Sequence, residues 1–476
     1  MLKLLKVCLS YNFKERLGYM KILYISLGCD KNLVDSEVML GIIRDRGFEL
    51  TNDELEAELI IINTCCFIND AKEESINTIL EMAEYKRIGK LKGLIVTGCL
   101  SQRYQEEMLE EIPEVDAIVG TTSYDQIVSV IDEVLEGKKA ISMRDLEYLP
   151  SVRTKRLNTT GGYYSYLKIA EGCNKHCTYC IIPKVRGNYR SVSMEALISE
   201  AKELVNNGAK ELILVAQETT LYGLDLYGEK SLPKLLKELC NIKDLKWIRV
   251  LYAYPEEISD EIIQVIKEED KICKYIDMPI QHASNNILKR MGRKTNKEEL
   301  VNIIKKLRNY IPDIVIRTTL ISGFPGETNK DHEELMEFVR DMRFDRLGVF
   351  NYSREEDTIA AIMEGHITEE VKEQRRNEIM KLQQNIAFEQ GKDMIGKKLN
   401  VIIEGKLPDE EVLDFSNDEA KSIYITRTYK DAPDVDGYLF MPSSREFISG
   451  EFVDVEVVES REYDLIGRLI SKEEEQ

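Results

Sequence analysis

Short β-branched runs that alternate with amphipathic helical runs constrain the fold of this chain more than any other feature. Between residues 20 and 140, four such runs are each followed by a segment with the 3.6-residue period of a helix: KILYISLGC (21–29), ELIIINTCC (58–66), KGLIVTGC (92–99) and VDAIVG (115–120). Repeated βα units of this kind build parallel sheets that are covered by helices. The sequence therefore predicts an α/β domain with a parallel sheet over 20–140.

A second βα series follows over 163–390. Helical segments such as 194–208 and 296–310 separate six strand candidates: YLKIAEG (166–172), ELILVAQ (211–217), KWIRVLY (246–252), KYIDMPI (274–280), IVIRTTLISG (314–323) and RLGVFNYS (346–353). Six such repeats predict a partial (β/α)6 barrel, with a functional site at the C-terminal ends of its strands.

The remaining segments have other patterns. Residues 141–162 are polar and contain Pro150 and Gly161-Gly162, which predicts a linker. Residues 368–390 read as one charged amphipathic helix. The period then changes to two, which predicts a small all-β barrel over 391–472. Residues 1–19 precede the first strand and have short apolar stretches broken by charges, so we expect a non-native or disordered extension.

Composition excludes several classes of protein. A length of 476 residues is enough for about three domains. No apolar run approaches the roughly 18 residues of a membrane span, so no membrane partner is expected. The net charge of −20 argues against a surface that binds nucleic acid everywhere. The ten cysteines of a long chain without a secretory signal favour metal binding or chemistry in a reducing cytoplasm over a disulfide scaffold.

The sharpest local motif runs from Glu171 to Cys180 and reads EGCNKHCTYC. Cys173, Cys177 and Cys180 have CxxxCxxC spacing directly after the first strand of the second series. Three thiolates can hold one [4Fe–4S] cluster and leave one iron open to a small molecule. A structural zinc site is the alternative, but it requires four closed ligands, and only His176 is near.

A second group of cysteines is dispersed along the first domain. Cys29, Cys65 and Cys99 each follow a predicted strand. The carboxyl ends of parallel strands share one edge of the sheet, where ligands bind, so these three side chains are expected to converge. Small residues also suit strand–helix turns in general, but three cysteines at three such turns favour a second cluster.

The CxxxCxxC segment resembles the radical S-adenosylmethionine (SAM) superfamily. The resemblance implies that SAM binds the open iron through its amino and carboxylate groups. Reduction of the cluster then releases a 5′-deoxyadenosyl radical. It also implies that the aromatic residue before the last cysteine, here Tyr179, lies near the adenine.

Two three-cysteine sites followed by a β module resemble the methylthiotransferases over residues 20–470. These enzymes have a cluster domain, a radical SAM barrel and a TRAM barrel, and they insert a methylthio group at a C–H bond. The branch that modifies ribosomal proteins is indicated by SLGCDKN (26–32), QETT (217–220), YGLDLYG (222–228), DMPIQHAS (277–284) and GVFNYSREE (348–356). Cys66 and Glu218 depart from this branch, which usually has glycine and aspartate there.

The charge of the β module gives a test that is independent of the resemblance. Residues 396–470 contain nine Lys and Arg against seventeen Asp and Glu, a net charge of −8. A module that grips tRNA is expected to carry Lys and Arg for the phosphates, whereas an acidic module suits a basic protein substrate. A solvated acidic face is the plain alternative.

The resemblance implies that the substrate is an aspartate of ribosomal protein uS12, free or in the small ribosomal subunit. It also implies two [4Fe–4S] clusters, SAM and an electron donor. Five further candidates for SAM binding lie at or near the ends of the barrel strands: Gln217, Glu218, Gln281, Arg317 and Gly323. No acid–base pair is assigned a catalytic role. Two other functions remain open, a tRNA adenosine methylthiotransferase and a non-catalytic iron–sulfur scaffold or carrier.

Overall fold

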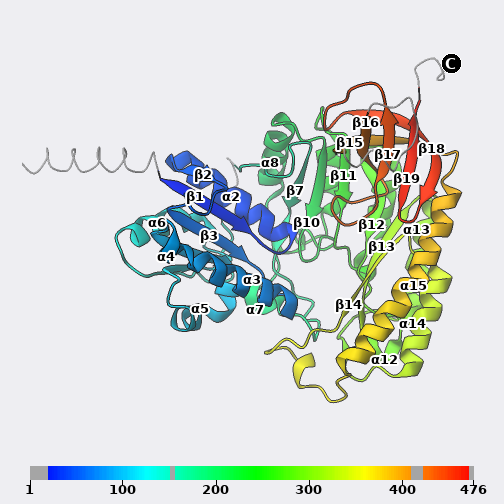
Figure 1. The fold of residues 1–476 in the computed structure, drawn as a ribbon. Helices are drawn as coiled ribbons and strands as arrows, with labels where there is room; N and C mark the ends of the chain where they lie inside the picture. The colour runs from blue at the N-terminus through cyan, green and yellow to red at the C-terminus, as the bar shows by residue number, and fades with distance from the viewer. Residues whose placement is uncertain (1–19, 151–155, 409–421, 471–476) are drawn as a thin grey trace, which may run out of the picture. The chain divides into compact units, whose positions relative to one another are not determined.

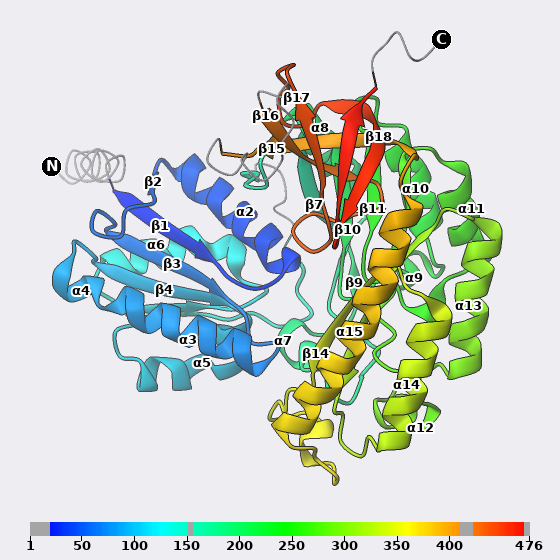
Figure 2. The same ribbon diagram turned by 45° about the vertical axis from the view of Figure 1, so that its right-hand side comes forward.

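The structure, a computed structural model, describes residues 20–150, 156–408 and 422–470. The extension expected over 1–19 lies outside these residues. By contacts between its residues the chain divides into two compact units (Figures 1 and 2). The first unit contains the described residues up to Thr159, together with Ala170–Val192 and Ser353–Ala361. The second unit contains the remaining described residues.

The first unit is built on a six-stranded parallel sheet with the strand order β2-β1-β3-β4-β5-β6. Its strands are β1 (Lys21–Ser26), β2 (Glu49–Thr51), β3 (Leu59–Thr64), β4 (Gly93–Gly98), β5 (Ala117–Val119) and β6 (Ala140–Ser142). The helices between them are α2 (Asp30–Arg46), α3 (Asn69–Ala83), α4 (Tyr85–Ile88), α5 (Cys99–Glu111), the 3-10 turn η1 (Tyr124–Gln126) and α6 (Ile127–Leu135).

Both faces of this sheet are covered. Apolar residues of α2 and α6 pack on one face, and those of α3 and α5 pack on the other. Every residue of β3 and β4 is therefore buried. This burial explains why these strands are nearly continuous apolar runs rather than alternating ones. The predicted parallel α/β domain is confirmed.

Two edge strands were not predicted from the sequence. β2 and β6 contain three residues each and pair with β1 and β5. Ile141 and Ser142, expected in a linker over 141–162, instead belong to β6. A three-residue strand is shorter than the period-two pattern that reveals longer strands, so only its pairing with β5 defines it.

The second unit contains the predicted partial barrel. Its six parallel strands have the order β14-β13-β12-β11-β10-β7 and do not close. They are β7 (Tyr164–Lys168), β10 (Glu211–Val215), β11 (Trp247–Val250), β12 (Ile272–Asp277), β13 (Val315–Ser322) and β14 (Arg346–Asn351). Their order in the sheet follows their order in the chain, as consecutive βα units of a barrel require.

Helices connect these strands or follow the last of them, and η3 crosses the boundary with the first unit. They are α8 (Met194–Asn206), α9 (Leu224–Tyr227), α10 (Leu232–Cys240), η2 (Pro255–Glu257), α11 (Asp260–Glu268), α12 (Asn285–Arg290), α13 (Lys297–Tyr310), α14 (Asn329–Met342), η3 (Ala360–Ile362) and α15 (Glu369–Asp393). Local sequence fixes several of their starts. Ser193, Asn296 and Thr328 cap α8, α13 and α14 through their side chains, and Thr328 forms a full capping box with Asp331.

The C-terminal module is a closed five-stranded barrel, as the change to a period of two predicted. Its strands pair in the order β15-β16-β17-β19-β18. They are β15 (Lys398–Lys406), β16 (Ser422–Thr428), β17 (Leu439–Ser443), β18 (Phe452–Arg461) and β19 (Asp464–Leu469). Figure 2 shows α15 running beside β14 toward this barrel, and Phe388 of α15 meets Tyr463 edge to face. Closure leaves no exposed sheet edge.

A buried ionic network joins the closed barrel to the partial barrel. The Arg427 guanidinium binds Glu211 at 2.5 Å and Glu404 at 2.7 Å, and Arg249 binds Glu211 at 2.8 Å. Arg427, Arg249 and Glu211 are fully buried. Removal of either arginine would leave the carboxylate of Glu211 short of a partner, so the network is expected to hold the two barrels in one arrangement. No helix in the described part of the chain is long and apolar enough to cross a bilayer.

Candidate functional site

The three dispersed cysteines come together at the carboxyl edge of the first sheet. Cys29 precedes α2, Cys65 follows β3, and Cys99 follows β4 as the first residue of α5. The strands before them, β1, β3 and β4, are adjacent in the sheet. The thiol of Cys65 is close enough to those of Cys99 and Cys29 for both to raise its pKa. We call Cys29, Cys65 and Cys99 the strand-end set; their role as ligands of one cluster stays a prediction.

Two glycines make this convergence possible. Gly28 has a φ of +89°, and a Cβ at that position would lie 2.6 Å from the Cβ of Cys65. Gly98 has a φ of +95°, and a Cβ there would collide with the side-chain oxygen of Asn63 and the carbonyl of Thr64. Only glycine combines a positive φ with such close approach. The residue before two of the three cysteines is therefore fixed by packing around the site.

Asn32 ties the three cysteine positions together, although it was not predicted as a site residue. Its side-chain amide donates to the carbonyl of Leu27 at 3.1 Å and to that of Thr64 at 2.9 Å. Its side-chain oxygen lies 3.8 Å from the sulfur of Cys99. Asn63 supports it by donating to the Asn32 carbonyl at 2.9 Å. The available sequence signal was a polar Asn63 inside an otherwise apolar buried strand.

Burial controls the protonation of Cys65 and Cys99, the two buried members of the strand-end set. Burial raises the pKa of the Cys65 thiol to about 12, and the neighbouring thiols of Cys99 and Cys29 add to the effect. Burial also raises the pKa of Cys99, against the opposing influence of the Arg186 guanidinium. These thiols are therefore protonated near neutral pH, and a bound metal must replace their protons. The resulting donor set is three sulfurs, which is the soft set that iron–sulfur clusters use.

The CxxxCxxC cysteines lie in a loop of the same unit. The loop runs between β8 (Ala170–Glu171) and α7 (Ile182–Arg186), and β8 pairs with β9 (Arg190–Ser191). Cys173 and Cys177 are buried and Cys180 is half-buried. We call Cys173, Cys177 and Cys180 the loop set.

Backbone contacts shape this loop. The amide of Cys173 donates to the carbonyl of Gly187 at 3.1 Å, and the amide of Cys180 donates to the carbonyl of Cys177 at 3.0 Å. The amide of Lys175 approaches the sulfur of Cys173 at 3.5 Å. His176 has a φ of +52° and an exposed side chain. The exposed imidazole of His176 does not join the buried thiols as a fourth ligand.

In neither set are the three thiols gathered around the position of a single metal ion. Within the described residues, no three Cys, His, Asp or Glu side chains stand close enough to bind a single metal ion. A [4Fe–4S] cluster does not need such a gathering, because each thiolate binds a different iron at a different corner. The assignment of one cluster to each set therefore stays a prediction.

Tyr179 and the other candidates for SAM binding belong to different units. Tyr179 lies in the loop of the first unit, and the others lie in the second. Glu218 accepts hydrogen bonds from the amide and hydroxyl of Thr220. Gln281 has a φ of +71°, and its amide donates to the carbonyl of Thr319 at 2.9 Å, which prolongs the parallel pairing beyond β12.

Two of these candidates have partners within the protein. Arg317 binds Asp277 at 3.0 Å and approaches Asp436 of the closed barrel at 3.5 Å. The amide of Gly323 donates to the carboxylate of Glu327 at 2.7 Å, and a Cβ there would collide with the side chain of Lys372. These contacts give Arg317 and Gly323 structural roles, and their predicted contact with SAM stays a prediction.

The sequence favours a hydrogen-bonded structural role for His282 over a ligand role, and the structure describes its surroundings. Burial lowers the pKa of His282 to about 3, so its imidazole is neutral. Its Nδ1 accepts a hydrogen bond from the amide of Ser284 at 2.9 Å. Its Nε2 lies 3.8 Å from the carboxylate of Glu327, while the contact at Nδ1 orders the following turn.

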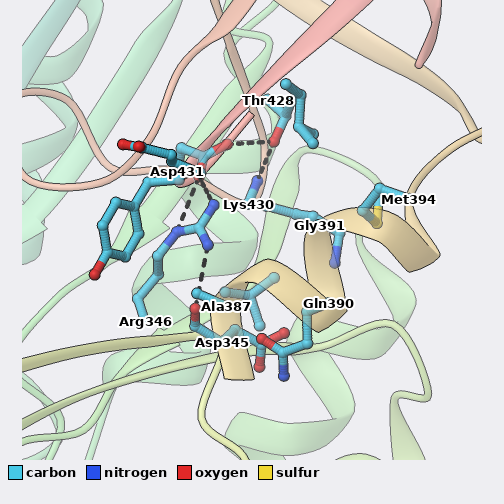
Figure 3. A pocket seen from close by; sticks show the side chains of 13 residues that line it. Asp345, Arg346, Ala387, Gln390, Gly391, Met394, Thr428, Lys430 and Asp431 are labelled. Atoms are coloured by element: carbon cyan, nitrogen blue, oxygen red, sulfur yellow. Dashed lines mark hydrogen bonds and ion pairs between the residues drawn. The ribbon is translucent and has the colours of Figure 1, made fainter. Parts of the chain in front are cut away.

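A pocket in the second unit has no cysteine among its described lining residues. It is bounded by β13, β14, α15 and the closed barrel, and Figure 3 shows its polar side chains bound to one another. Arg346 binds Asp431, which also accepts from the hydroxyl of Thr428 at 2.7 Å. Because its charged groups are paired with each other, this pocket reads as part of the joint between the two barrels.

Comparison with known families matches three segments. Residues 21–120 match the Uncharacterized protein family UPF0004, residues 167–339 match the Radical SAM superfamily, and residues 395–470 match the TRAM domain. Their order along the chain is the order expected from the sequence.

Curated relatives match over nearly the whole chain. A protein of Lachnoclostridium phytofermentans is 66% identical over 448 residues, which cover 94% of this chain and 99% of the relative. Proteins of Clostridioides difficile and Acetivibrio thermocellus are 51% and 49% identical, each covering 95% of this chain and 99% of the relative. All three are named ribosomal protein uS12 methylthiotransferase RimO.

Solved structures resemble the fold at low identity. The radical SAM methyltransferase TsrM from Kitasatospora setae, with cobalamin and a [4Fe–4S] cluster bound, has a TM-score of 0.53 at 12% identity and covers 72% of this chain and 77% of its own. The cobalamin-dependent SAM radical enzyme OxsB has a TM-score of 0.50 at 14% identity and covers 77% of this chain and 57% of its own. At these identities the likeness concerns the fold alone.

Proposed function

The chain belongs to the RimO family of radical SAM methylthiotransferases, and from this premise we propose that it attaches a methylthio group to the β-carbon of an aspartate in ribosomal protein uS12. The observation that carries the proposal is the presence of two separate three-thiol sets in one compact unit, on a chain whose relatives of 66% and 51% identity carry this name over their whole length.

Each thiol set has its own ligand role in this proposal. Cys173, Cys177 and Cys180 would hold one [4Fe–4S] cluster that binds SAM at its open iron. Cys29, Cys65 and Cys99 would hold the second. When bound, these groups supply one-electron chemistry that reaches an unactivated C–H bond, together with the sulfur to be inserted. Such chemistry avoids forming a carbanion beside the carboxylate of the substrate aspartate.

The protein's residues provide the surroundings of this chemistry. Burial of Cys65, Cys99, Cys173 and Cys177 keeps water from the sulfurs. Tyr179, Gln217, Glu218, Gln281, Arg317 and Gly323 remain our candidates for binding SAM. The proposed domains are 20–140, 163–390 and 391–472, with a linker between the first two, and the family matches at 21–120, 167–339 and 395–470 support them.

The proposed partners follow from the same site. The net charge of −8 over 396–470 suits a basic ribosomal protein, free or in the small subunit, better than tRNA. A one-electron donor must reduce the cluster. We propose a cytoplasmic location, because the substrate is a ribosomal protein.

One anaerobic reaction tests the proposal. Reconstituted protein, SAM and a chemical reductant are mixed with uS12 and bulk tRNA, and both are analysed by mass spectrometry. We expect a methylthio group in place of hydrogen on one uS12 aspartate, and no product with Cys173→Ala. The same gain on a tRNA adenosine would overturn the substrate assignment. SAM left uncleaved by fully loaded, reduced protein would instead favour an iron–sulfur scaffold or carrier.

A further inference from the structure

Arg186 is a fully buried guanidinium that the proposed chemistry does not yet use. It is the last residue of α7, the helix that follows the loop set, and is 2% exposed. A buried arginine stays charged, because its pKa lies far above neutral pH. Such a charge is costly to bury unless every donor finds a partner. The partners of Arg186 therefore indicate what the residue does.

The guanidinium reaches both cysteine sets at once. Its Nε donates to the sulfur of Cys99 at 3.4 Å. One terminal nitrogen donates to Asp35 of α2 at 2.7 Å and to Glu171 of β8 at 3.1 Å, while the other donates to the side-chain oxygen of Asn32. Glu171 is two residues before Cys173 of the loop set. One side chain thus contacts the segment that carries the loop set, a strand-end thiol and the asparagine that orders the strand-end set.

The two carboxylates fix the direction of the donor at Nε. A planar guanidinium that is held by Asp35 and Glu171 on one side and by Asn32 on the other cannot rotate, so its Nε–H remains aimed at the sulfur. Asp35 is 4% exposed and Glu171 is 3% exposed. These carboxylates offset the positive charge of the guanidinium. The main effect of Arg186 on Cys99 is therefore the hydrogen bond from its Nε to the sulfur.

We propose that Arg186 is a positioning residue that tunes the cluster held by Cys29, Cys65 and Cys99 through its hydrogen bond to the Cys99 sulfur. This inference rests on the proposed function, in which that set holds a [4Fe–4S] cluster. Hydrogen bonds to cluster sulfurs and nearby positive charge favour the reduced cluster, because reduction adds negative charge. Arg186 therefore raises the reduction potential of this cluster.

A purely structural ion pair is the rival explanation, and the same unit contains a matched control. Arg156 is buried and its Nε binds Glu37 of α2 at 2.6 Å, with Glu37 fully buried. Arg156 thus resembles Arg186 in burial and in pairing with a carboxylate of the same helix. The described partner of the Arg156 Nε is a carboxylate, whereas the Nε of Arg186 donates to the sulfur of Cys99. Arg156→Lys therefore reports the effect of disturbing a buried arginine alone.

The test uses full-length protein in which Cys173, Cys177 and Cys180 are alanine, so that only the strand-end cluster is present. Iron content and the Fe–S stretching bands in resonance Raman spectra are measured first. The midpoint potential then follows from a redox titration monitored by electron paramagnetic resonance. The variants are Arg186→Lys, Arg186→Met, Asp35→Asn and Arg156→Lys.

Arg186→Lys and Arg186→Met should lower the midpoint potential. Loss of a hydrogen bond to a charged sulfur corresponds to about a tenfold smaller ratio of reduced to oxidised cluster at a fixed potential, or 59 mV for a one-electron couple. Asp35→Asn leaves Glu171 and Asn32 to hold the guanidinium and removes a negative charge, so it should raise the potential. Arg156→Lys should leave the potential and the Fe–S bands unchanged.

Opposite shifts for Arg186 and Asp35 variants cannot arise from a general loosening of the fold. Unchanged potentials in loaded Arg186→Lys and Asp35→Asn proteins, or shifts of the same sign in both, would overturn the inference, even if Arg186→Met fails to fold. Failure of the parent protein to bind four irons would refute the proposed cluster itself, and this outcome is visible before any variant is compared.

Discussion

The strand-end set and the loop set present the same three thiols but are built in opposite ways. The loop set comes from eight consecutive residues between β8 and α7, and backbone hydrogen bonds such as that from Cys173 to Gly187 shape it. The strand-end set is assembled from three strand ends that the sheet makes neighbours. Its geometry depends on Gly28, Gly98 and Asn32, which hold no metal themselves.

The two sets are therefore sensitive to different substitutions. A contiguous motif carries its own geometry, so the rest of the chain mainly protects it. A dispersed set has no local geometry, and every contact that fixes the strand ends acts as part of the site. Substitutions of residues that touch no ligand should therefore damage the strand-end set selectively.

The largest effect is expected from removing either set entirely. Replacing Cys29, Cys65 and Cys99 by alanine, or the three loop-set cysteines, should lower product formation more than about a thousandfold. Each change should also lower bound iron from about eight to about four per chain, since each set holds one four-iron cluster. Iron analysis and mass spectrometry of uS12 measure both effects. Cys240→Ala, in the helix α10, is the control, and a triple variant with full iron would contradict the assignment.

The next largest effect is expected from Gly98→Ala, and Gly137→Ala separates steric collision at this site from the strain of a positive φ. Gly98→Ala should deplete iron from the strand-end set and spare the loop set, because the added Cβ collides with Asn63 and Thr64. Gly137 also has a positive φ, +78°, but nothing lies within 4 Å of a Cβ there. Gly137→Ala should therefore cost only about 1 kcal/mol in the free energy of unfolding and keep all the iron.

Urea unfolding of the metal-free proteins gives the second readout for this pair. Gly98→Ala should lose about 1–3 kcal/mol more than Gly137→Ala, because overpacking adds to strain. Equal losses in the two variants, with equal iron, would show that the strand-end set tolerates movement of β4. The contrast between the two sets would then fail.

A smaller effect is expected from the support residue Asn32. Asn32→Ala removes the donors to Leu27 and Thr64, and the affinity of the strand-end set for its cluster should fall about 10- to 100-fold. Iron retained during chelator challenge measures this loss. Asn188 of the same unit is exposed, and its amide binds Glu147 at 2.8 Å, so Asn188→Ala is the control. Equal retention by both variants would remove Asn32 from the site.

The contrast also explains what could be predicted from the sequence. The loop set can be recognised from its contiguous CxxxCxxC motif. The strand-end set can be recognised once β1, β3 and β4 are taken as neighbours in a parallel sheet. Both predictions use local order alone: a residue, the strand before it and the edge that parallel strands share. The partial barrel and the closed β barrel were predictable for the same reason, since hydrophobic period reveals long repeated elements.

The support residues could not be predicted in this way. Arg186 and Asn32 are separated by 154 residues, and Arg186 and Asp35 by 151. No periodicity selects Arg186 from the other 64 basic residues, because its role depends on the packing of α7 against α2 and α5. The three-residue strands β2 and β6 could not be predicted for a related reason. Their pairing, and not their sequence, makes them strands.

The smallest predicted effect sharpens the contrast through pH. Burial raises the pKa of Cys65 in the folded protein to about 12 from an ordinary value of 9.0. A thiol whose folded pKa is raised stabilises the fold fully below pH 9, and this contribution is lost as pH rises from 9 toward 12. Metal-free protein should therefore lose about 1 kcal/mol of unfolding free energy through Cys65 between pH 8 and pH 10.

Cys65→Ser isolates this contribution, because serine is close in size and does not titrate in this range. Urea unfolding curves of metal-free wild type and Cys65→Ser, measured from pH 8 to pH 10, should converge by about that amount as pH rises. Cluster-loaded protein should show no such dependence, since its thiols are already deprotonated as ligands. Parallel curves for the two metal-free proteins would mean that Cys65 is hydrated in solution. The strand-end set would then lack the dry, preformed edge on which its difference from the loop set depends.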